Sequence, residues 1–179
     1  MAPAEFDIVF DTTKGTFKAR VHREWAPEGA DRLHELVSEG FFNDVAVFRM
    51  LDGFVAQFGI SGDPEIGASW REKPIPDDPV KTSNTEGTIS YAMAGLGTRT
   101  TQLFVNLTDN TRLDSMGFAP VAEVVEGMDV VRSLYGGYGE GAPRGNGPNQ
   151  GEIQRRGNEY LREEYPDLDY VQEARIDGA

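Results

Sequence analysis

The stretch from Phe48 to Gly59 reads FRMLDGFVAQFG and sets one arginine and one glutamine among apolar residues. If it forms two short strands, side chains alternate between the faces of a sheet, so Arg49 and Leu51 share one face while Val55 and Gln57 share another. The stretch contains no obvious catalytic nucleophile. A guanidinium beside an amide on an apolar wall can grip a carbonyl-rich ligand, so the stretch indicates binding chemistry, with an ordinary surface arginine as the alternative.

The strands predicted on either side of this stretch are short and numerous. Glu5–Thr12 and Thr16–Val21 alternate apolar and polar residues around Lys14-Gly15, which is typical of a hairpin. The other expected strands cover residues 45–51, 55–58, 88–93, 103–106, 119–125 and 169–176. So many short strands, separated by turn-rich segments, favour a closed barrel or a sandwich.

Helices are predicted at two places beside the sheet and at a third near the C-terminus. Residues 27–39 have apolar side chains at helical spacing between Pro27 and Gly40, and residues 127–134 form a second, shorter pattern. Residues 136–151, GGYGEGAPRGNGPNQG, are dense in Gly and Pro and are predicted to be loop. An added helix is expected over about 152–164, within one domain that spans residues 1–179.

Composition excludes several classes of function. The chain has 179 residues, and its 30 acidic against 17 basic side chains give a net charge of -13, which argues against nucleic acid and anionic membranes as partners. The absence of cysteine excludes disulfides and thiol catalysis. No apolar run reaches the roughly 20 residues of a membrane span, and the N-terminus does not resemble a signal peptide. A cytoplasmic protein is expected, with an exported form that has lost its leader as the alternative.

Other possible reaction centres are weak. His22 and His34 have no metal-ligand spacing around them and are expected to be solvated. The pair Asp77-Asp78 lies in a Pro-rich loop, where carboxylates cap turns more often than they catalyse. A loose G-x-G-x-x-A pattern follows a predicted helix instead of a strand, so it lacks the context of a dinucleotide site. No metal or cofactor is expected.

Four segments, in their order and spacing, resemble the cyclophilin family of peptidyl-prolyl cis-trans isomerases. They are FRMLDGFVAQFG, GTISYAMAG (Gly87–Gly95), TQLFVNL (Thr101–Leu107) and LDSMGFAPVAEVVEGMDVV (Leu113–Val131). The resemblance runs from about Phe6 to Arg132, and the tail from Gly136 onward looks like that of a bacterial subgroup. It implies a mainly β protein, an eight-stranded antiparallel closed barrel capped by two helices, which acts as a monomeric rotamase in protein folding.

The resemblance also implies which residues form the site. The family's catalytic arginine falls on Arg49, and its glutamine that contacts the substrate backbone falls on Gln57, with Phe54 beside them in the catalytic set. The substrate-binding positions are those of the proline pocket, of the edge that receives the peptide backbone, and of the rim: Phe48, Val55, Ala92, Met93, Ala94, Gln102, Phe104, Arg112, Leu113 and Phe118. The expected partners are proline-containing peptides and unfolded or partly folded proteins.

Five positions depart from the family's usual pattern. Phe48 and Phe118 stand where histidines are frequent, Met93 where an asparagine is usual, and Leu103 where a phenylalanine is usual. Arg112 replaces the tryptophan associated with tight cyclosporin binding, so weakened affinity for that compound is expected.

Two other readings of the chain remain at this point. The first is a non-enzymatic proline-peptide binding or chaperone module on the same fold. The second is a small-ligand barrel of the lipocalin type, which would need an apolar cavity in its interior.

Overall fold

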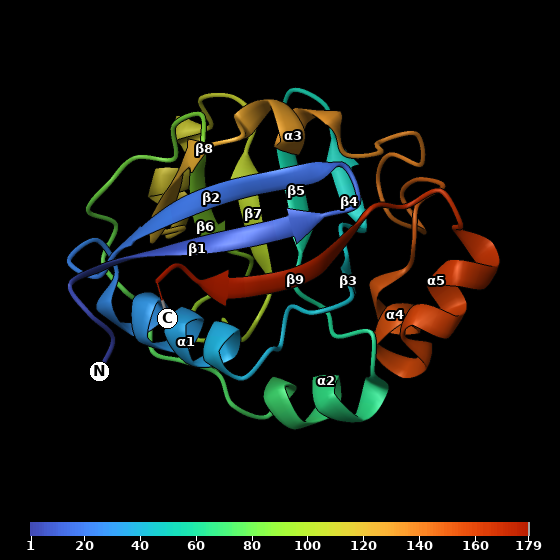
Figure 1. The fold of residues 1–179 in the computed structure, drawn as a ribbon, viewed down its shortest axis with the longest axis horizontal. Helices are drawn as coiled ribbons and strands as arrows, with labels where there is room; N and C mark the ends of the chain where they lie inside the picture. Colours follow the sequence, from blue (N-terminus) through green and yellow to red (C-terminus); the bar gives the residue numbers. More distant parts are fainter. Residues whose placement is uncertain (179) are drawn as a thin grey trace.

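The computed structural model describes residues 1–178, in which one antiparallel sheet curls around an apolar core (Figure 1). The sheet is nine-stranded across the described residues, in the order β3-β9-β1-β2-β8-β6-β7-β5-β4. Its strands are β1 (Glu5–Thr12), β2 (Gly15–His22), β3 (Val45–Ala46), β4 (Arg49–Leu51), β5 (Val55–Phe58), β6 (Thr88–Tyr91), β7 (Leu103–Asn106), β8 (Ala122–Glu126) and β9 (Tyr170–Ile176).

The two edge strands of this sheet, β3 and β4, follow one another in the chain with only Val47 and Phe48 between them. They are the two halves of the single strand predicted over residues 45–51. Val45 and Ala46 pair with β9, and the Val47 N–H donates to the carbonyl of Asp169 (2.9 Å), the residue just before β9. From Arg49 onward the chain pairs with β5 instead, and this change of partner divides the strand in two. The mainly β antiparallel fold is confirmed, and the count of nine in place of eight reflects this break.

Aromatic side chains fill the interior of the curled sheet. Phe10 stacks on Phe17 with ring centroids 4.7 Å apart, and it meets Phe42 and Phe58 edge to face at 6.4 and 5.7 Å. All four rings are at most 2% exposed. Close packing of this kind stabilises the fold through apolar burial and leaves the interior occupied by side chains, which argues against the lipocalin-type alternative.

The helices pack around the curled sheet. They are α1 (Pro27–Ser38), α2 (Pro64–Arg71), the 3-10 helix η1 (Thr111–Met116), α3 (Met128–Ser133), α4 (Gln150–Arg156) and α5 (Asn158–Glu164). α1 and α3 contribute Leu33, Leu36 and Val131 to the apolar core of the sheet. α1 and α3 confirm the helices predicted at residues 27–39 and 127–134. α2 and η1 were not predicted from the sequence.

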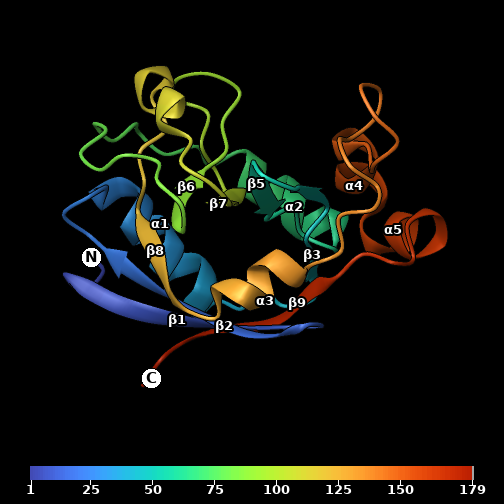
Figure 2. The same cartoon turned by 90° about the horizontal axis from the view of Figure 1, so that it is seen from above.

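Residues 136–164, called the insert below, form a lobe at the end of the molecule away from α1 (Figures 1 and 2). It contains two short helices where one was expected over 152–164, and α4 already begins at Gln150, inside the predicted loop. The helices separate at Gly157, which has φ +63°, and a Cβ there would overlap the carbonyl oxygen of Gly62. The insert packs on the barrel through a second apolar cluster: Ala46, Phe48, Ile60, Ile153, Tyr160, Leu161 and Leu168.

Asp78 caps the distant start of α1 instead of a turn in its own loop, which was the role expected from the sequence. Its carboxylate accepts hydrogen bonds from the backbone N–H groups of Glu28 (3.0 Å) and Gly29 (2.9 Å) at the start of α1, and from Arg99 (3.0 Å). The side chains of Asp78 and Arg99 are both 3% exposed. The pair therefore neutralises a buried arginine and satisfies the first N–H groups of a helix at once.

Both histidines pack against aromatic side chains. His22 stacks on Trp25 at 4.1 Å and contacts the carboxylates of Glu123 (2.7 Å) and Glu5 (3.3 Å), so it is more enclosed than the expected solvated residue. His34 meets Phe6 edge to face at 5.0 Å. Within residues 1–178 no group of three or more His, Cys, Asp or Glu side chains is placed to hold a metal ion. None of the helices in that range has both the length and the apolar character needed to cross a bilayer.

Candidate active site

The register of the sheet places a row of functional side chains across three strands. Arg49 on β4 is paired with Gln57 on β5, and Gln57 is paired with Phe104 on β7. Residues that lie directly opposite one another project from the same face of a sheet. Arg49 and Gln57 therefore share one face, which corrects the expectation that they lie on different faces. Their neighbours Met50 and Ala56 point into the barrel core, so this row lies on the outer surface.

An apolar pocket lies beside this row. Val55, Phe104 and Leu113 form its buried floor, with Phe54, Ala92 and Phe118 packed around them. The rings of Phe104 and Phe118 meet edge to face at 5.6 Å. The pocket has a volume of about 480 Å³, large enough for a proline ring and its neighbouring peptide groups.

The guanidinium of Arg49 is held on two sides. Its Nε and Nη2 donate to Oε1 and Oε2 of Glu140, both at 2.8 Å, and its Nη1 donates to Oε1 of Gln57 at 2.9 Å. It also lies over the ring of Phe54, 5.8 Å from the centroid. The Arg49 side chain is 23% exposed, so the charge is half-enclosed by protein and still borders the pocket.

The polar row continues beyond Arg49. The side-chain amide of Gln57 donates to Oε1 of Gln102 (2.8 Å), and Gln102 donates to Oε1 of Gln150 (3.3 Å) at the start of α4. The row therefore begins and ends on the insert, at Glu140 and Gln150. These hydrogen bonds fix the orientation of the Gln57 and Gln102 side chains along one edge of the pocket.

Arg49 lowers the pKa of its partner, Glu140. The hydrogen bonds from Arg49 hold the pKa of the Glu140 carboxyl at about 2, against the opposing effect of partial burial and with help from the Gly141 N–H. Glu140 is therefore a carboxylate at neutral pH. Since the folded structure depresses this pKa from its ordinary value of 4.5, the stability that the carboxylate contributes is fully present above that value and is lost progressively as the pH falls from 4.5 through about 2.

The insert forms the second wall of the pocket, a feature that the sequence analysis missed. Figure 2 shows the insert and η1 on opposite sides of the molecule, and both contribute residues to the lining of the pocket. The lining residues from the insert are Glu140, Gly141, Ala142, Pro143, Arg144, Pro148, Asn149, Gln150 and Gly151. The only signal in the sequence was an acidic side chain inside a Gly/Pro-rich loop, and that composition does not reveal where a loop lies.

The structure brings most of the predicted site residues together. Those that line the pocket are Phe48, Arg49, Phe54, Val55, Gln57, Ala92, Met93, Phe104, Leu113 and Phe118. Ala94 and Gln102 instead line an adjoining pocket of about 430 Å³ that shares Gln57, Ala92 and Met93. Arg112 is exposed at the rim, with its guanidinium 5.1 Å from the ring centroid of Phe54.

Phe48 lines the pocket and also belongs to the second apolar cluster. It is 3% exposed and belongs to the cluster through which the insert packs on the barrel. A histidine there would bring a polar ring into that apolar contact. A phenylalanine at position 48 therefore suits the apolar contact with the insert.

The chain is similar in sequence to known proteins. The family model described as cyclophilin type peptidyl-prolyl cis-trans isomerase/CLD matches residues 6–153. Peptidyl-prolyl cis-trans isomerase B of Escherichia coli is 30% identical, over 72% of this chain and 84% of that protein. Peptidyl-prolyl cis-trans isomerase A of Dickeya dadantii is also 30% identical, over 71% of this chain and 70% of the relative.

Solved structures show the same fold. A cyclophilin-type peptidyl-prolyl cis-trans isomerase from Cryptosporidium parvum has a TM-score of 0.69 at 14% identity, covering 98% of this chain and 99% of the other. A structure of the same protein in the presence of the dipeptide Ala-Pro has a TM-score of 0.67, also at 14% identity, over 97% and 99% of the two chains.

Proposed function

The chain belongs to the cyclophilin-type family of peptidyl-prolyl cis-trans isomerases, and we propose that it binds Xaa-Pro segments in the pocket between the barrel and the insert. Arg49 is the group that speeds rotation about the prolyl bond. The observation that carries this proposal is a half-enclosed guanidinium at the edge of an apolar pocket of about 480 Å³.

The chemistry required is modest in energy. Rotation about a peptide bond faces a barrier of about 18–20 kcal/mol because resonance gives the C–N bond double-bond character. Xaa-Pro bonds exchange over tens to hundreds of seconds without a catalyst. A turnover of about 10–1000 per second therefore needs roughly 4–7 kcal/mol of transition-state stabilisation. No covalent bond is broken, so no acid–base pair is needed.

The site contains groups suited to supply this energy. Twisting the amide localises a lone pair on the prolyl nitrogen, to which the Arg49 guanidinium can donate while it also holds the proline carbonyl. One preorganised donor is worth about 2.7–4 kcal/mol. The apolar floor formed by Val55, Phe104 and Leu113 holds the proline ring while the preceding residue turns, and partial desolvation of the amide contributes to the remainder.

The substrate class follows from the same pocket. Its apolar floor fits a proline ring, and residues 92–94 after β6 offer a backbone edge at the rim. The Cryptosporidium parvum relative was solved in the presence of the dipeptide Ala-Pro, which is a minimal ligand of this kind. We propose that proline-containing segments of unfolded or partly folded proteins are the natural substrates.

Turnover is the decisive test of this function. NMR exchange spectroscopy on a short Xaa-Pro peptide, whose uncatalysed exchange is slow, is expected to show cis–trans exchange when catalytic amounts of the protein are added. Binding of the peptide without faster exchange would instead establish the non-enzymatic peptide-binding alternative.

The same assay tests the proline pocket. Phe118→Ala removes the ring that meets Phe104 and is expected to raise KM by roughly five- to tenfold while kcat is largely kept, since about 1–1.5 kcal/mol of apolar contact is lost. Met116→Ala is the matched control because Met116 lies on the neighbouring η1 and is largely exposed. Equal KM values for the two variants would contradict the assignment of Phe118 to the pocket.

Cyclosporin binding is expected to be weak. Arg112 places an exposed charge over Phe54, where an indole would offer an apolar face. The insert also forms a wall on the other side of the pocket. Calorimetry is expected to give an affinity weaker than the nanomolar range, and Arg112→Trp should strengthen it. Nanomolar affinity of the unmodified protein would contradict the prediction.

A further inference from the structure

The contact between Glu140 and Arg49 joins the insert to the proposed catalytic group. The two residues lie 91 positions apart in the sequence, and their side chains make two parallel hydrogen bonds of 2.8 Å. Paired hydrogen bonds between a guanidinium and a carboxylate fix the plane of the guanidinium as well as its position. A single contact to Gln57 would leave rotation about that contact open.

Glu140 is itself held in place by the loop around it. One carboxylate oxygen, Oε1, accepts the Gly141 N–H at 2.9 Å, and the Glu140 carbonyl accepts the Gly147 N–H at 2.8 Å. Gly147 in turn accepts hydrogen bonds on its carbonyl from the Ala142 N–H (3.0 Å) and the Tyr165 hydroxyl (3.0 Å). The segment that carries the carboxylate is therefore held by hydrogen bonds within the loop and to Tyr165 at the end of α5.

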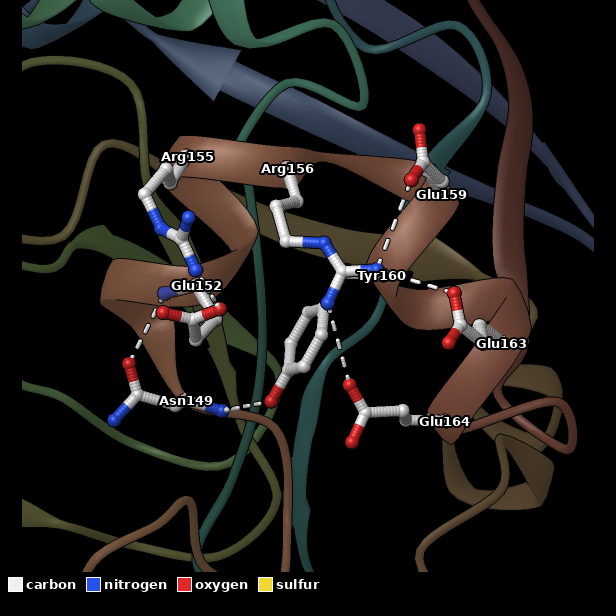
Figure 3. Close-up of polar contacts among 8 residues, drawn as sticks. All are labelled: Asn149, Glu152, Arg155, Arg156, Glu159, Tyr160, Glu163 and Glu164. Atoms are coloured by element: carbon white, nitrogen blue, oxygen red, sulfur yellow. Dashed lines mark hydrogen bonds and ion pairs between the residues drawn. The ribbon is translucent and has the colours of Figure 1, made fainter.

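The base of the loop is anchored as well (Figure 3). The Asn149 N–H donates to the Tyr160 hydroxyl (3.1 Å), and the Asn149 side chain caps α4 at the N–H of Glu152 (3.0 Å). Arg156 lies over the Tyr160 ring and faces Glu163 at 3.1 Å, with two further carboxylates of α5 nearby. Tyr160 is also buried in the second cluster, to which Phe48 belongs. These contacts hold the base of the loop against α4 and α5, so the insert forms a fixed wall of the pocket.

The hydrogen-bonding capacity of Arg49 shows what the clamp leaves free. A guanidinium carries five N–H donors, one on Nε and two on each Nη. Glu140 takes the Nε donor and one on Nη2, and Gln57 takes one on Nη1. One N–H therefore remains on each Nη, which is the pair needed to reach a prolyl nitrogen and a neighbouring carbonyl.

We propose that Glu140 is a positioning residue for the isomerisation: it holds the Arg49 guanidinium so that its two remaining Nη donors face the proline pocket. The inference rests on the proposed role of Arg49. Its physical basis is preorganisation, because an arginine side chain that is already fixed loses little conformational freedom when it binds the twisted amide. The opposite reading, in which the carboxylate shields the arginine from substrate, predicts a faster enzyme without Glu140.

A double-mutant cycle separates these readings. Glu140→Ala in the otherwise unchanged protein is expected to lower kcat by about tenfold with little change in KM, since misplacement of a catalytic group costs rate. Glu140→Gln, which keeps the shape and one acceptor, should lose less. In the Arg49→Ala background, Glu140→Ala should change the residual rate by less than about twofold, because residues that act as a unit are not additive.

The control lies in the insert itself. Glu152→Gln removes a carboxylate on α4 that pairs with the exposed Arg155, and it is expected to leave kcat and KM unchanged. A faster Glu140→Ala enzyme, an unchanged one, or equal losses in both arginine backgrounds would overturn the inference, the last because it would indicate a general role in holding the insert. Arg49→Ala as active as the unmodified protein would instead remove the role of Arg49, and absence of turnover in the unmodified protein would remove the function itself.

Discussion

Arg49→Ala is expected to lose at least roughly tenfold, and about a hundredfold or more if the full value of a preorganised donor is realised, in kcat/KM for an Xaa-Pro peptide. The guanidinium borders the apolar pocket and keeps one N–H donor on each Nη that Glu140 and Gln57 do not use. Most of the loss should appear in kcat, because the donor acts on a lone pair that develops only as the amide twists.

The fold should survive this substitution. Arg49 projects from the outer face of β4, and its removal leaves Glu140 at the surface, where the carboxylate is 37% exposed and keeps the Gly141 N–H. Circular dichroism and the thermal midpoint should therefore stay close to those of the unmodified protein. Arg49→Lys is the sharper comparison: it keeps the charge but cannot form the paired hydrogen bonds, so it should recover little activity. An unchanged rate in Arg49→Ala, with an unchanged spectrum, would refute the assignment.

Only part of the row that contains Arg49 could be predicted from the sequence. Alternation along two strands indicated which side chains project together within each strand, but the pairing of Arg49 with Gln57 depends on register, which a single sequence specifies only through the turn between them. The main strands and α1 were also accessible, because their apolar spacing is regular and their ends carry Gly or Pro.

Helix α2 was missed for a physical reason. It has only eight residues, with an exposed Ile66 and a Gly67, so its apolar periodicity is weak. A local signal was nonetheless present. Asp63 caps the helix through the N–H of Glu65 at 2.9 Å, and Pro64 follows at the first helical position. Capping residues identify such a helix better than periodicity does.

The insert could not be placed from sequence because its position depends on contacts far along the chain. Glu140 has no neighbour in sequence that predicts a contact with Arg49, and the pattern around Phe48 does not indicate that this side chain packs in the cluster beside the insert. Glycine-rich loops owe their path to backbone hydrogen bonds, such as the one from Gly147 to Glu140, which leave no side-chain pattern. Departures from a family's usual residues are therefore most informative where an added segment covers the surface.

Asp78→Ala is expected to lower the free energy of unfolding by about 3–5 kcal/mol, because removing one partner of a buried ion pair leaves an uncompensated charge. Arg99 would be left 3% exposed with its remaining partners, the carbonyl of Pro76 and the ring of Tyr91 at 5.5 Å. The first N–H groups of α1 would lose their acceptor as well. For a chain of this size the thermal midpoint should fall by roughly 6–20 °C.

The neighbouring residue provides a matched control for this prediction. Asp77 is exposed and its carboxylate accepts the Gly97 N–H at 3.0 Å, so Asp77→Ala should change stability by less than about 1 kcal/mol. Asp78→Asn combined with Arg99→Met keeps an oxygen for the helix cap and removes the buried charge, so it should recover part of the loss in Asp78→Ala. Equal thermal midpoints for Asp77→Ala and Asp78→Ala would show that the pair contributes little. A double variant no more stable than Asp78→Ala would show instead that the loss does not arise from an uncompensated arginine.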